Sequence, residues 1–264
     1  MEVHHHPHVA KKNFKEYFLE FLMIFLAVSM GFIAENLREH FTEKSNAREY
    51  AHLLVNDLNS DVKELNRTHY VLDRIIKAGD SLSSLISSPN FDQTPGGKLY
   101  YYEYWSSWQW RVTPQDATFK QLQSSGALRY IGNAPLIKKI LNYQESLKII
   151  ALLESNSSNE KSENWKLVQK VFYLQNFNTL DTIKSAARDS ASQISSTNSD
   201  ALDKFKNTNY PLMTRDKDKM LELANWALSS SRSYKTLLRT VNFAKQKAIE
   251  AIEGIKEEYK MEDR

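Results

Sequence analysis

Apolar residues form one unbroken stretch near the start of the chain and recur at helical spacing through most of the remainder. Fourteen consecutive residues without a charge, FLMIFLAVSMGFIA, run from Phe21 to Ala34. Counted from Phe14, the apolar segment has 21 residues, and at about 1.5 Å per residue it matches the thickness of a bilayer's hydrocarbon core. No small-residue cleavage motif follows, so residues 14–34 predict an uncleaved transmembrane helix. The alternative is an amphipathic or buried helix.

The next segment continues the helical pattern without a break. No Gly or Pro occurs from residue 35 to residue 78, and apolar residues recur three or four positions apart. The membrane helix is therefore expected to continue through residues 35–86 as a stalk and as the first helix of a bundle. Residues 42–49, TEKSNARE, have little apolar content and would form a bare connector between the bilayer and the domain.

The densest aromatic segment of the chain follows a loop at residues 87–98. Three interpretations of this segment remain open. It caps the apolar interior of the bundle, it is an exposed partner surface, or it touches lipid at the interface, where Trp and Tyr are enriched. A partner surface would use seven aromatic residues: Tyr100, Tyr101, Tyr102, Tyr104, Trp105, Trp108 and Trp110.

Cap residues predict where the remaining helices begin and end. Thr113 predicts a helix start with Pro at its first position, Gly126 predicts the end of that helix, and Asn133 caps the next one. Residues 178–209 are rich in polar residues, which predicts short helices, and Thr214 is expected to cap a last long helix.

The predicted fold is all-α, with one N-terminal transmembrane helix that continues into an elongated antiparallel helical bundle. An even number of helices in the domain would return the C-terminus toward the membrane. The predicted parts are a His-rich tail at 1–13, the transmembrane helix at 14–34, the stalk and first bundle helix at 35–86, and the remaining helical domain at 87–264.

Composition narrows the class of protein. The 264 residues carry 35 basic and 32 acidic side chains, a net charge of +3, and this near balance argues against a nucleic-acid binder. Cysteine is absent, which excludes disulfides, thiolate nucleophiles and Cys-based metal sites and fits an oxidising envelope compartment. The chain has only 7 Gly and 6 Pro, as expected for long helices.

The charges on the two sides of the uncharged run from Phe21 to Ala34 predict the orientation of the helix. Lys11, Lys12 and Lys15 precede this run, whereas the opposite side opens with Glu35 and has a net acidic character. The positive-inside rule then places the N-terminus in the cytoplasm. The main domain is expected outside the inner (cytoplasmic) membrane, which in a bacterium with two membranes is the periplasm.

Three residues of the membrane segment are candidates for a contact between chains. Glu20 places a carboxylate inside the apolar stretch, where it either snorkels to the interface or meets a partner. Ser29 and Gly31 are small enough to let helices approach closely, although they do not form a GxxxG pair. The expected partners are therefore the lipid bilayer and further copies of the chain, which would form a homo-oligomer.

Four histidines lie close together before the apolar segment. His4, His5, His6 and His8 fall within five residues, and neutral imidazoles bind zinc, copper and nickel. A divalent transition metal is the one cofactor that the sequence suggests. A pH-sensitive or headgroup-facing tail and a tail without a defined role are the alternatives.

The sequence contains none of the common catalytic motifs, including the P-loop, GxSxG, HExxH and Rossmann fingerprints. Asp57 and Asp61 are four residues apart and would share a helix face, where a solvated surface is favoured over a cation site. Arg129 lies in a polar turn, where it either binds an anion or ties the turn to a neighbouring helix; the tie is favoured. The chain is expected not to be an enzyme.

Two segments resemble a known family. The start, MEVHHHPH followed by KKNFKEYFLEFLMIFLAVSMGFIAENLREH, and residues 116–133, DATFKQLQSSGALRYIGN, look like those of an uncharacterised family of membrane-anchored proteins from Bacteroidota. The resemblance covers about 40 residues at the start and roughly 18 in the second segment. It implies a single-span inner-membrane protein with a helical domain and a native His-rich start, and it supplies no catalytic residues.

The expected function is that of a non-enzymatic, membrane-anchored scaffold or adaptor. It would self-associate through its membrane helix and stalk and present the aromatic segment to a protein partner in the envelope. Two alternatives remain, a periplasmic ligand sensor or signalling module and a metal-handling protein that uses the His cluster.

Overall fold

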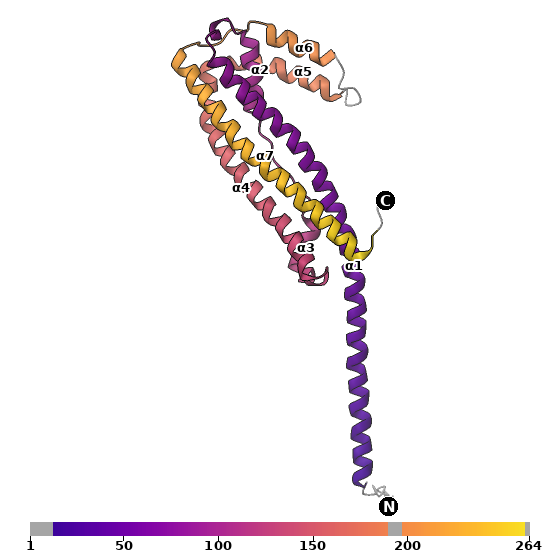
Figure 1. Ribbon diagram of the computed structural model, residues 1–264. Coiled ribbons are helices and arrows are strands. Elements are labelled where there is room, and N and C mark those ends of the chain that lie inside the picture. The colour runs from indigo at the N-terminus through magenta and orange to yellow at the C-terminus, as the bar shows by residue number, and fades with distance from the viewer. Residues whose placement is uncertain (1–12, 190–196, 262–264) are drawn as a thin grey trace, which may run out of the picture.

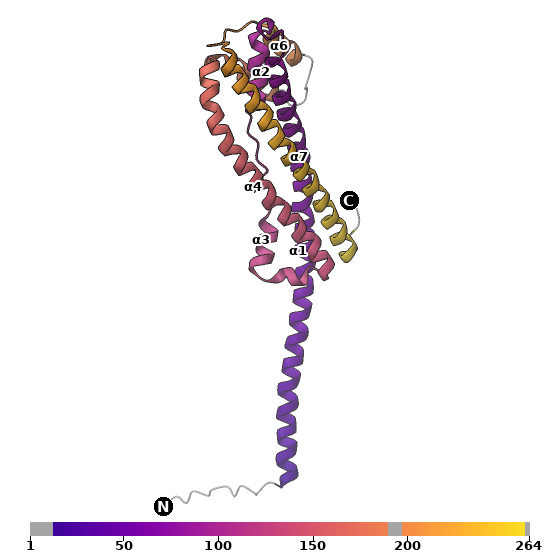
Figure 2. The same ribbon diagram turned by 60° about the vertical axis from the view of Figure 1, so that its left-hand side comes forward.

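The computed structural model describes residues 13–189 and 197–261 and confirms the all-α prediction, since these ranges contain helices and no strand. In these ranges the long helix α7 packs along the bundle part of α1 and along a third long helix, α4, and four shorter α-helices complete the domain (Figures 1 and 2). The helices are α1 (Phe14–Ile86), α2 (Gly96–Ser106), α3 (Ala117–Ser124), α4 (Ala134–Val171), α5 (Phe177–Asp189), α6 (Thr197–Asn207) and α7 (Lys217–Tyr259).

Helix α1 is continuous over 73 residues, as the uninterrupted helical pattern predicts. Its first part projects from the bundle as a single helix (Figure 1). An 18-residue window in this part has a mean hydropathy of 2.1 and is 0% buried, so it is long and apolar enough to cross a membrane. The first buried residue of α1 is Ala47. Bundle packing therefore begins inside residues 42–49, which the sequence suggested as a bare connector, and the free stalk beyond the apolar segment is only about 18 Å long.

The part of α1 within the bundle buries a heptad stripe. Its buried positions alternate at intervals of three and four residues, as in a coiled coil. We call this stripe the α1 seam, and it consists of Ala51, Leu54, Leu58, Asp61, Leu65, Thr68, Leu72, Ile75, Gly79, Leu82 and Ile86.

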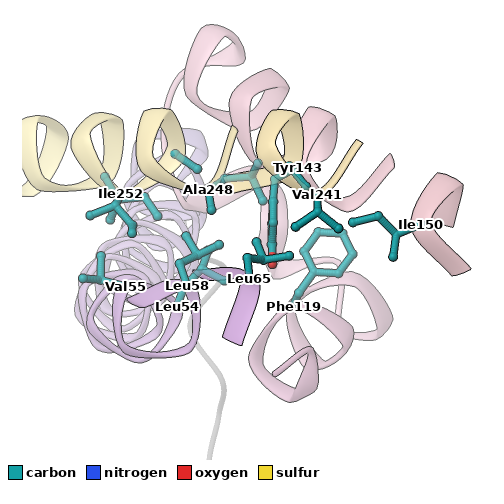
Figure 3. Packing of buried hydrophobic residues seen from close by; sticks show 14 of the residues in the cluster. Leu54, Val55, Leu58, Leu65, Phe119, Tyr143, Ile150, Val241, Ala248 and Ile252 are labelled. Carbon is teal, nitrogen blue, oxygen red and sulfur yellow. The ribbon is translucent and has the colours of Figure 1, made fainter. Parts of the chain in front are cut away.

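Helix α7 carries a matching stripe and runs antiparallel to α1. Several of its seam residues are alanines, which allow the two helices to approach closely; a Cβ added at Gly79 of α1 would lie 2.9 Å from the carbonyl oxygen of Ala227. Leu58, Leu65, Val241 and Ala248 point into one common core with Tyr143 of α4 (Figure 3). This packing stabilises the bundle mainly by burying apolar surface.

An extended segment, residues 107–116, runs along the bundle between α2 and α3. Its backbone N–H groups are bound by side chains of the long helices, including Asp61, which accepts from Gln115 N at 2.7 Å, and Glu154, which accepts from Val112 N at 2.8 Å. The prediction of a helix start at Thr113 is therefore wrong. The helix begins three residues after Pro114, because α1 and α4 hold the preceding backbone extended.

The other cap predictions are mostly confirmed. Asn133 accepts a hydrogen bond from Leu136 N at the start of α4, and Gly126 adopts a left-handed conformation with φ 70° after α3. Asp216 rather than Thr214 caps α7, since its side chain accepts from Lys219 N. Helix α7 returns the chain to the base of the bundle, where Tyr259 lies beside α1. The number of long helices is odd, and the C-terminus returns because the extended segment makes one of the passes along the bundle.

The end of the bundle away from the projecting helix has its own small core. Here α2, α5 and α6 pack over the ends of the long helices, and Tyr100 lies at the centre with its ring 4.8 Å from that of Phe172. Tyr100 also donates to the carbonyl of Pro211 at 2.9 Å. We call this end of the molecule the distal end, and it contains the candidate functional site.

Candidate functional site

A cavity of about 490 Å³ opens at the distal end, between α2, the segment after it, α4 and α5. Its size falls in the range of small-molecule sites. Residues at its mouth are exposed, including Trp165, at 45% exposure, whereas Glu103 at its inner side is 1% exposed. The lining consists of Glu103, Tyr104, Ser107, Trp108, Gln109, Trp165, Leu174, Phe177, Asn178 and Asp181.

Aromatic rings form much of the cavity wall because α2 and α5 place them side by side. The ring of Tyr104 lies 5.7 Å from that of Trp108 and 6.4 Å from that of Phe177. The Tyr104 hydroxyl donates to Asp181 Oδ1 at 2.6 Å, which fixes a carboxylate at the edge of the wall. Burial, and then Asp181, raise the pKa of this tyrosine, so it stays a neutral donor.

Glu103 is the most deeply buried acid of the site. Ser107 and Ser106 donate to its carboxylate, and Asn164 of α4 adds a further side-chain hydrogen bond. Burial raises the pKa of Glu103 to about 7, although these hydrogen bonds and the nearby Lys161 act in the opposite direction. The Glu103 carboxyl group therefore titrates near neutral pH.

Lys161 of α4 lies behind the cavity and is 7% exposed. Its ammonium donates to the carbonyl of Trp108 and lies 4.7 Å from the centre of the Tyr234 ring of α7. Burial lowers the pKa of Lys161 to about 7, although the negative charge of Glu103 acts in the opposite direction. Burial of both partners thus favours a neutral acid beside a neutral amine, and their mutual attraction favours the charged pair.

Asn164 is 4% exposed, and its Oδ1 has no hydrogen-bond partner within the described part of the chain. A second hollow, of about 290 Å³, is lined by Asn164 and Lys161 and shares Ser107, Gln109 and Trp165 with the first. The two hollows therefore lie side by side and share part of their walls. A buried acceptor without a donor is rare in proteins, and it marks a place where the chain does not complete its own polar network.

The site is connected to α1 through tryptophans. The Trp108 ring lies 5.8 Å from that of Trp105, and the Arg74 guanidinium of α1 stacks 3.8 Å over the Trp105 ring. Trp110 donates to Thr68 Oγ1 of the α1 seam at 2.9 Å, with Arg67 4.8 Å over its ring. The aromatic segment therefore packs against the helix that projects from the base.

The expectation of an exposed partner surface on the aromatic segment is wrong for Tyr100 and Trp105, which are 0% and 9% exposed. They belong to the core because α2 lies flat on the ends of the long helices. The remaining five predicted residues, Tyr101, Tyr102, Tyr104, Trp108 and Trp110, are half-buried. Helix α2 follows the end of α1, about 80 Å of helix beyond Ala34, which argues against a lipid-facing belt.

The three membrane-segment candidates do not share one helix face. Glu20 and Gly31 are eleven residues apart, about three turns, and lie on the same side of α1. Ser29 is nine residues from Glu20, about two and a half turns, and lies on the opposite side. A single contact between two such helices can include Glu20 and Gly31 but not Ser29.

The other predicted residues lie away from the cavity. His4, His5, His6 and His8 are outside the described residues, and within those residues no three His, Asp or Glu side chains are placed to hold a metal ion. Arg129 stacks on the neighbouring Tyr130, 4.6 Å from its ring centre, and binds its hydroxyl. These contacts hold Arg129 within its own turn, and among the residues that the structure describes no hydrogen bond or ion pair joins it to another helix.

The pair Asp57 and Asp61 does not form a solvated face. Asp61 is 2% exposed and accepts from Tyr143 at 2.7 Å as well as from Gln115 N. Asp57 accepts from Thr118 N at 3.3 Å, near the start of α3. Both acids hold the extended segment and α3 against α1.

Four residues of the site were not predicted from the sequence: Glu103, Lys161, Asn164 and Asp181. Glu103 carries a signal, because it is the one charge within the run YYYEYW. Lys161 and Asn164 lie in the polar stretch 155–164, but they continue the inward-facing heptad positions of α4 between Ser157 and Val168. Asp181 has no comparable sequence signal.

Comparison of the whole chain with known protein families, with curated proteins and with solved structures finds no match.

Proposed function

We propose that the chain is a single-span, membrane-anchored scaffold without enzymatic activity, which self-associates through α1 and holds its helical domain in the periplasm. The observation that carries this proposal is the projecting part of α1, whose apolar side chains are exposed while the rest of the same helix packs in the bundle. Such a surface requires a bilayer or other chains to cover it. The resemblance to the Bacteroidota family and the lysines before the segment support the anchor and its orientation.

Self-association is tested by disulfide crosslinking in intact membranes, for which the chain is suited because it has no native cysteine. Single substitutions Glu20→Cys, Ile24→Cys, Ala27→Cys and Gly31→Cys place one thiol at successive positions of one helix face. We expect oxidation to give a discrete dimer band from each of them.

Ser29→Cys is the matched control, because it lies at the same depth on the opposite face. Dimer bands of equal yield from Ser29→Cys and Gly31→Cys would indicate random collision. A strictly monomeric chain in all variants, with no co-purifying protein, would contradict the scaffold.

A sensor is the second candidate, favoured by the cavity at the distal end and its connection to α1 through Trp108, Trp105 and Arg74. An occupant that shifts these tryptophans would alter how α1 packs in the bundle and in an oligomer. Such a module would pass the change in α1 to a partner on the cytoplasmic side.

The sensor is tested with a thiol in the stalk. In a Leu37→Cys background, Arg74→Gln removes the stacking on Trp105, and we expect it to change the yield of the stalk disulfide. Lys77→Gln is the control, since Lys77 pairs only with Asp73 on the surface. Equal yields from Arg74→Gln and the control would contradict the sensor and leave the scaffold unaffected.

A further inference from the structure

The chemistry of the distal cavity identifies the kind of molecule that it fits. Its walls are aromatic, with Tyr104, Trp108, Trp165 and Phe177 contributing to one lining. The faces of aromatic rings carry negative electrostatic potential and attract cations, most strongly for Trp and Tyr. Apolar walls of this kind also favour a ligand with a hydrocarbon or aromatic body.

The charged groups of the lining are acidic. Two carboxylates, Glu103 and Asp181, lie among the described residues around the larger cavity, and no basic side chain does. Asp181 is held by the Tyr104 hydroxyl at 2.6 Å, so one oxygen faces a defined position at the cavity edge. A carboxylate fixed beside aromatic faces is the usual arrangement for an organic cation.

The charged groups in and behind the cavity sum to zero when one positive charge is added to the cavity. Lys161 compensates Glu103 electrostatically from behind the cavity, and its donors are directed to Trp108 and the Tyr234 ring. Asp181 then remains as a negative charge that no basic side chain of the described cavity lining offsets. A monovalent cation would bring the cavity to neutrality, whereas an anion would add a second negative charge beside Asp181.

One buried acceptor without a partner lies next to the cavity. Asn164 Oδ1, in a side chain that is 4% exposed, accepts no hydrogen bond within the described residues, and Asn164 lines the second hollow together with Lys161. Because this oxygen has almost no exposed surface, the acceptors of the cavity lining are the carboxylates of Glu103 and Asp181. A ligand with N–H groups, or a water that such a ligand orders, matches them better than a quaternary ammonium without N–H groups.

We infer that the distal cavity binds a small organic amine in its protonated form, with the ammonium group at Asp181 and Glu103 and the apolar body against Trp108, Trp165 and Phe177. This inference goes beyond the proposed scaffold and supplies the ligand class for the sensor. It holds whether or not binding is transmitted along α1.

The test uses the full-length protein in detergent micelles and two matched pairs of probes, tryptamine with its neutral alcohol analogue tryptophol, and phenethylamine with 2-phenylethanol. Binding is measured by calorimetry for all probes, with empty micelles as the blank, and also by tryptophan fluorescence for the phenethylamine pair, which lacks an indole. We expect each amine to bind at least about tenfold more tightly than its alcohol, because the alcohol lacks the charge that Asp181 and the rings attract. Indole-3-acetate, which carries a negative charge, should not bind.

The decisive variant is Asp181→Asn, because Asp181 is exposed and its replacement leaves the core intact. We expect it to weaken amine binding about tenfold with an unchanged thermal unfolding midpoint. Asp203→Asn on α6 is the matched control, an exposed aspartate that pairs with Lys206 outside the cavity lining, and it should bind as the wild type does.

Three outcomes would overturn the inference: alcohols that bind as tightly as their amines, amine binding that Asp181→Asn leaves unchanged, or no binding of either amine at about millimolar concentration. The disulfide pattern of the membrane helix is measured separately on the same chain. Failure of amine binding with an intact disulfide pattern would therefore refute this inference alone and leave the scaffold standing.

Discussion

Polar side chains interrupt the apolar seams of the bundle at a few positions, and most of them have a defined partner. Asp61 and Thr68 occur at seam positions of α1, and both bind the extended segment, through Gln115 N and Trp110. Asp80 accepts from Ser231 and pairs with Lys235 of α7 at 2.8 Å. These bonds fix which residues of the long helices lie opposite one another, a role that apolar side chains alone perform less specifically.

The bond between Tyr143 and Asp61 should contribute measurably to stability. Tyr143→Phe removes a donor from a carboxylate that is 2% exposed, and we expect the free energy of unfolding to fall by about 2 kcal/mol. Denaturant unfolding of the detergent-solubilised chain measures the change. Tyr70→Phe is the matched control, because Tyr70 is 76% exposed; equal losses in the two variants would contradict this role for Asp61.

Glu103 and Lys161 should make the protein least stable near neutral pH. The pKa of Glu103 rises from 4.5 to about 7 on folding, so between these values the unfolded chain has released a proton that the folded chain keeps, and stability falls as pH rises. The pKa of Lys161 falls from 10.5 to about 7, so above pH 7 the unfolded chain keeps a proton that the folded chain has lost, and stability rises. Each limb has a slope of at most about 1.4 kcal/mol per pH unit.

Denaturant unfolding at pH 5, 7 and 9 tests this pair, with the double variant Glu103→Gln, Lys161→Met as the comparison. Other groups titrate equally in both proteins, so their contribution cancels in the difference. We expect the wild type to show a minimum near pH 7 relative to the double variant. A difference that does not vary with pH would contradict the burial of both ionisable groups.

Among the elements, the long helices follow from the sequence and the extended segment does not. The apolar spacing in residues 35–86 predicts α1 to its last residue because a heptad seam is a local pattern. Thr113 and Pro114 also carry a local helix-start signal, but Asp61 and Glu154, distant in the sequence, bind the neighbouring N–H groups and hold the chain extended. Contacts of this kind leave no periodic trace in the segment that they hold.

The residues of the candidate site could not be predicted from the sequence for a related reason. The polar stretch 155–164 has the composition of a solvated surface, yet Ser157, Lys161 and Asn164 face inward because α4 continues through it without a break. The aromatic segment is evident in the sequence. Which of its residues belong to the core and which line the cavity depends on how α2 lies across the ends of the long helices. That orientation is set by tertiary packing.

The start of α2 should be sensitive to any added side chain. A Cβ at Gly97 would lie 2.0 Å from the carbonyl oxygen of Phe205 and 2.8 Å from that of Thr208, and both are backbone atoms that cannot turn away. We expect Gly97→Ala to lower the free energy of unfolding by about 2 kcal/mol or more and to weaken amine binding, because the clash displaces α2.

Asn59→Ala is the control for Gly97→Ala, since Asn59 is exposed on α1. The same denaturant unfolding measurement applies to both variants. A Gly97→Ala protein as stable as the Asn59→Ala protein would contradict the close packing of α2 against the chain near Thr208.

The whole molecule is a long helix with a domain built around its second half. The first part of α1 has an apolar surface that the domain does not cover, and the stalk between Ala34 and Ala47 is short (Figure 1). If the apolar segment spans the bilayer, the base of the bundle lies close to the lipid headgroups and the distal cavity opens about 80 Å of helix away. The proposed amine ligand would then be captured well outside the membrane.

The proposed function requires the helical domain to lie on the periplasmic side of the membrane. Because the chain has no cysteine, single thiols introduced at Asn59, which is exposed on α1, and at Ala10, in the N-terminal tail, report the two sides separately. A thiol at the buried Ala244 is the control for labelling of unfolded protein.

The labelling is performed with a membrane-impermeant maleimide on intact spheroplasts of a bacterium with two membranes, before and after lysis. We predict that Asn59→Cys is labelled in intact spheroplasts, that Ala10→Cys is labelled only after lysis, and that Ala244→Cys is labelled in neither case. Labelling of Ala10→Cys but not Asn59→Cys before lysis would reverse the orientation. Release of the protein into the soluble fraction would contradict the membrane anchor itself.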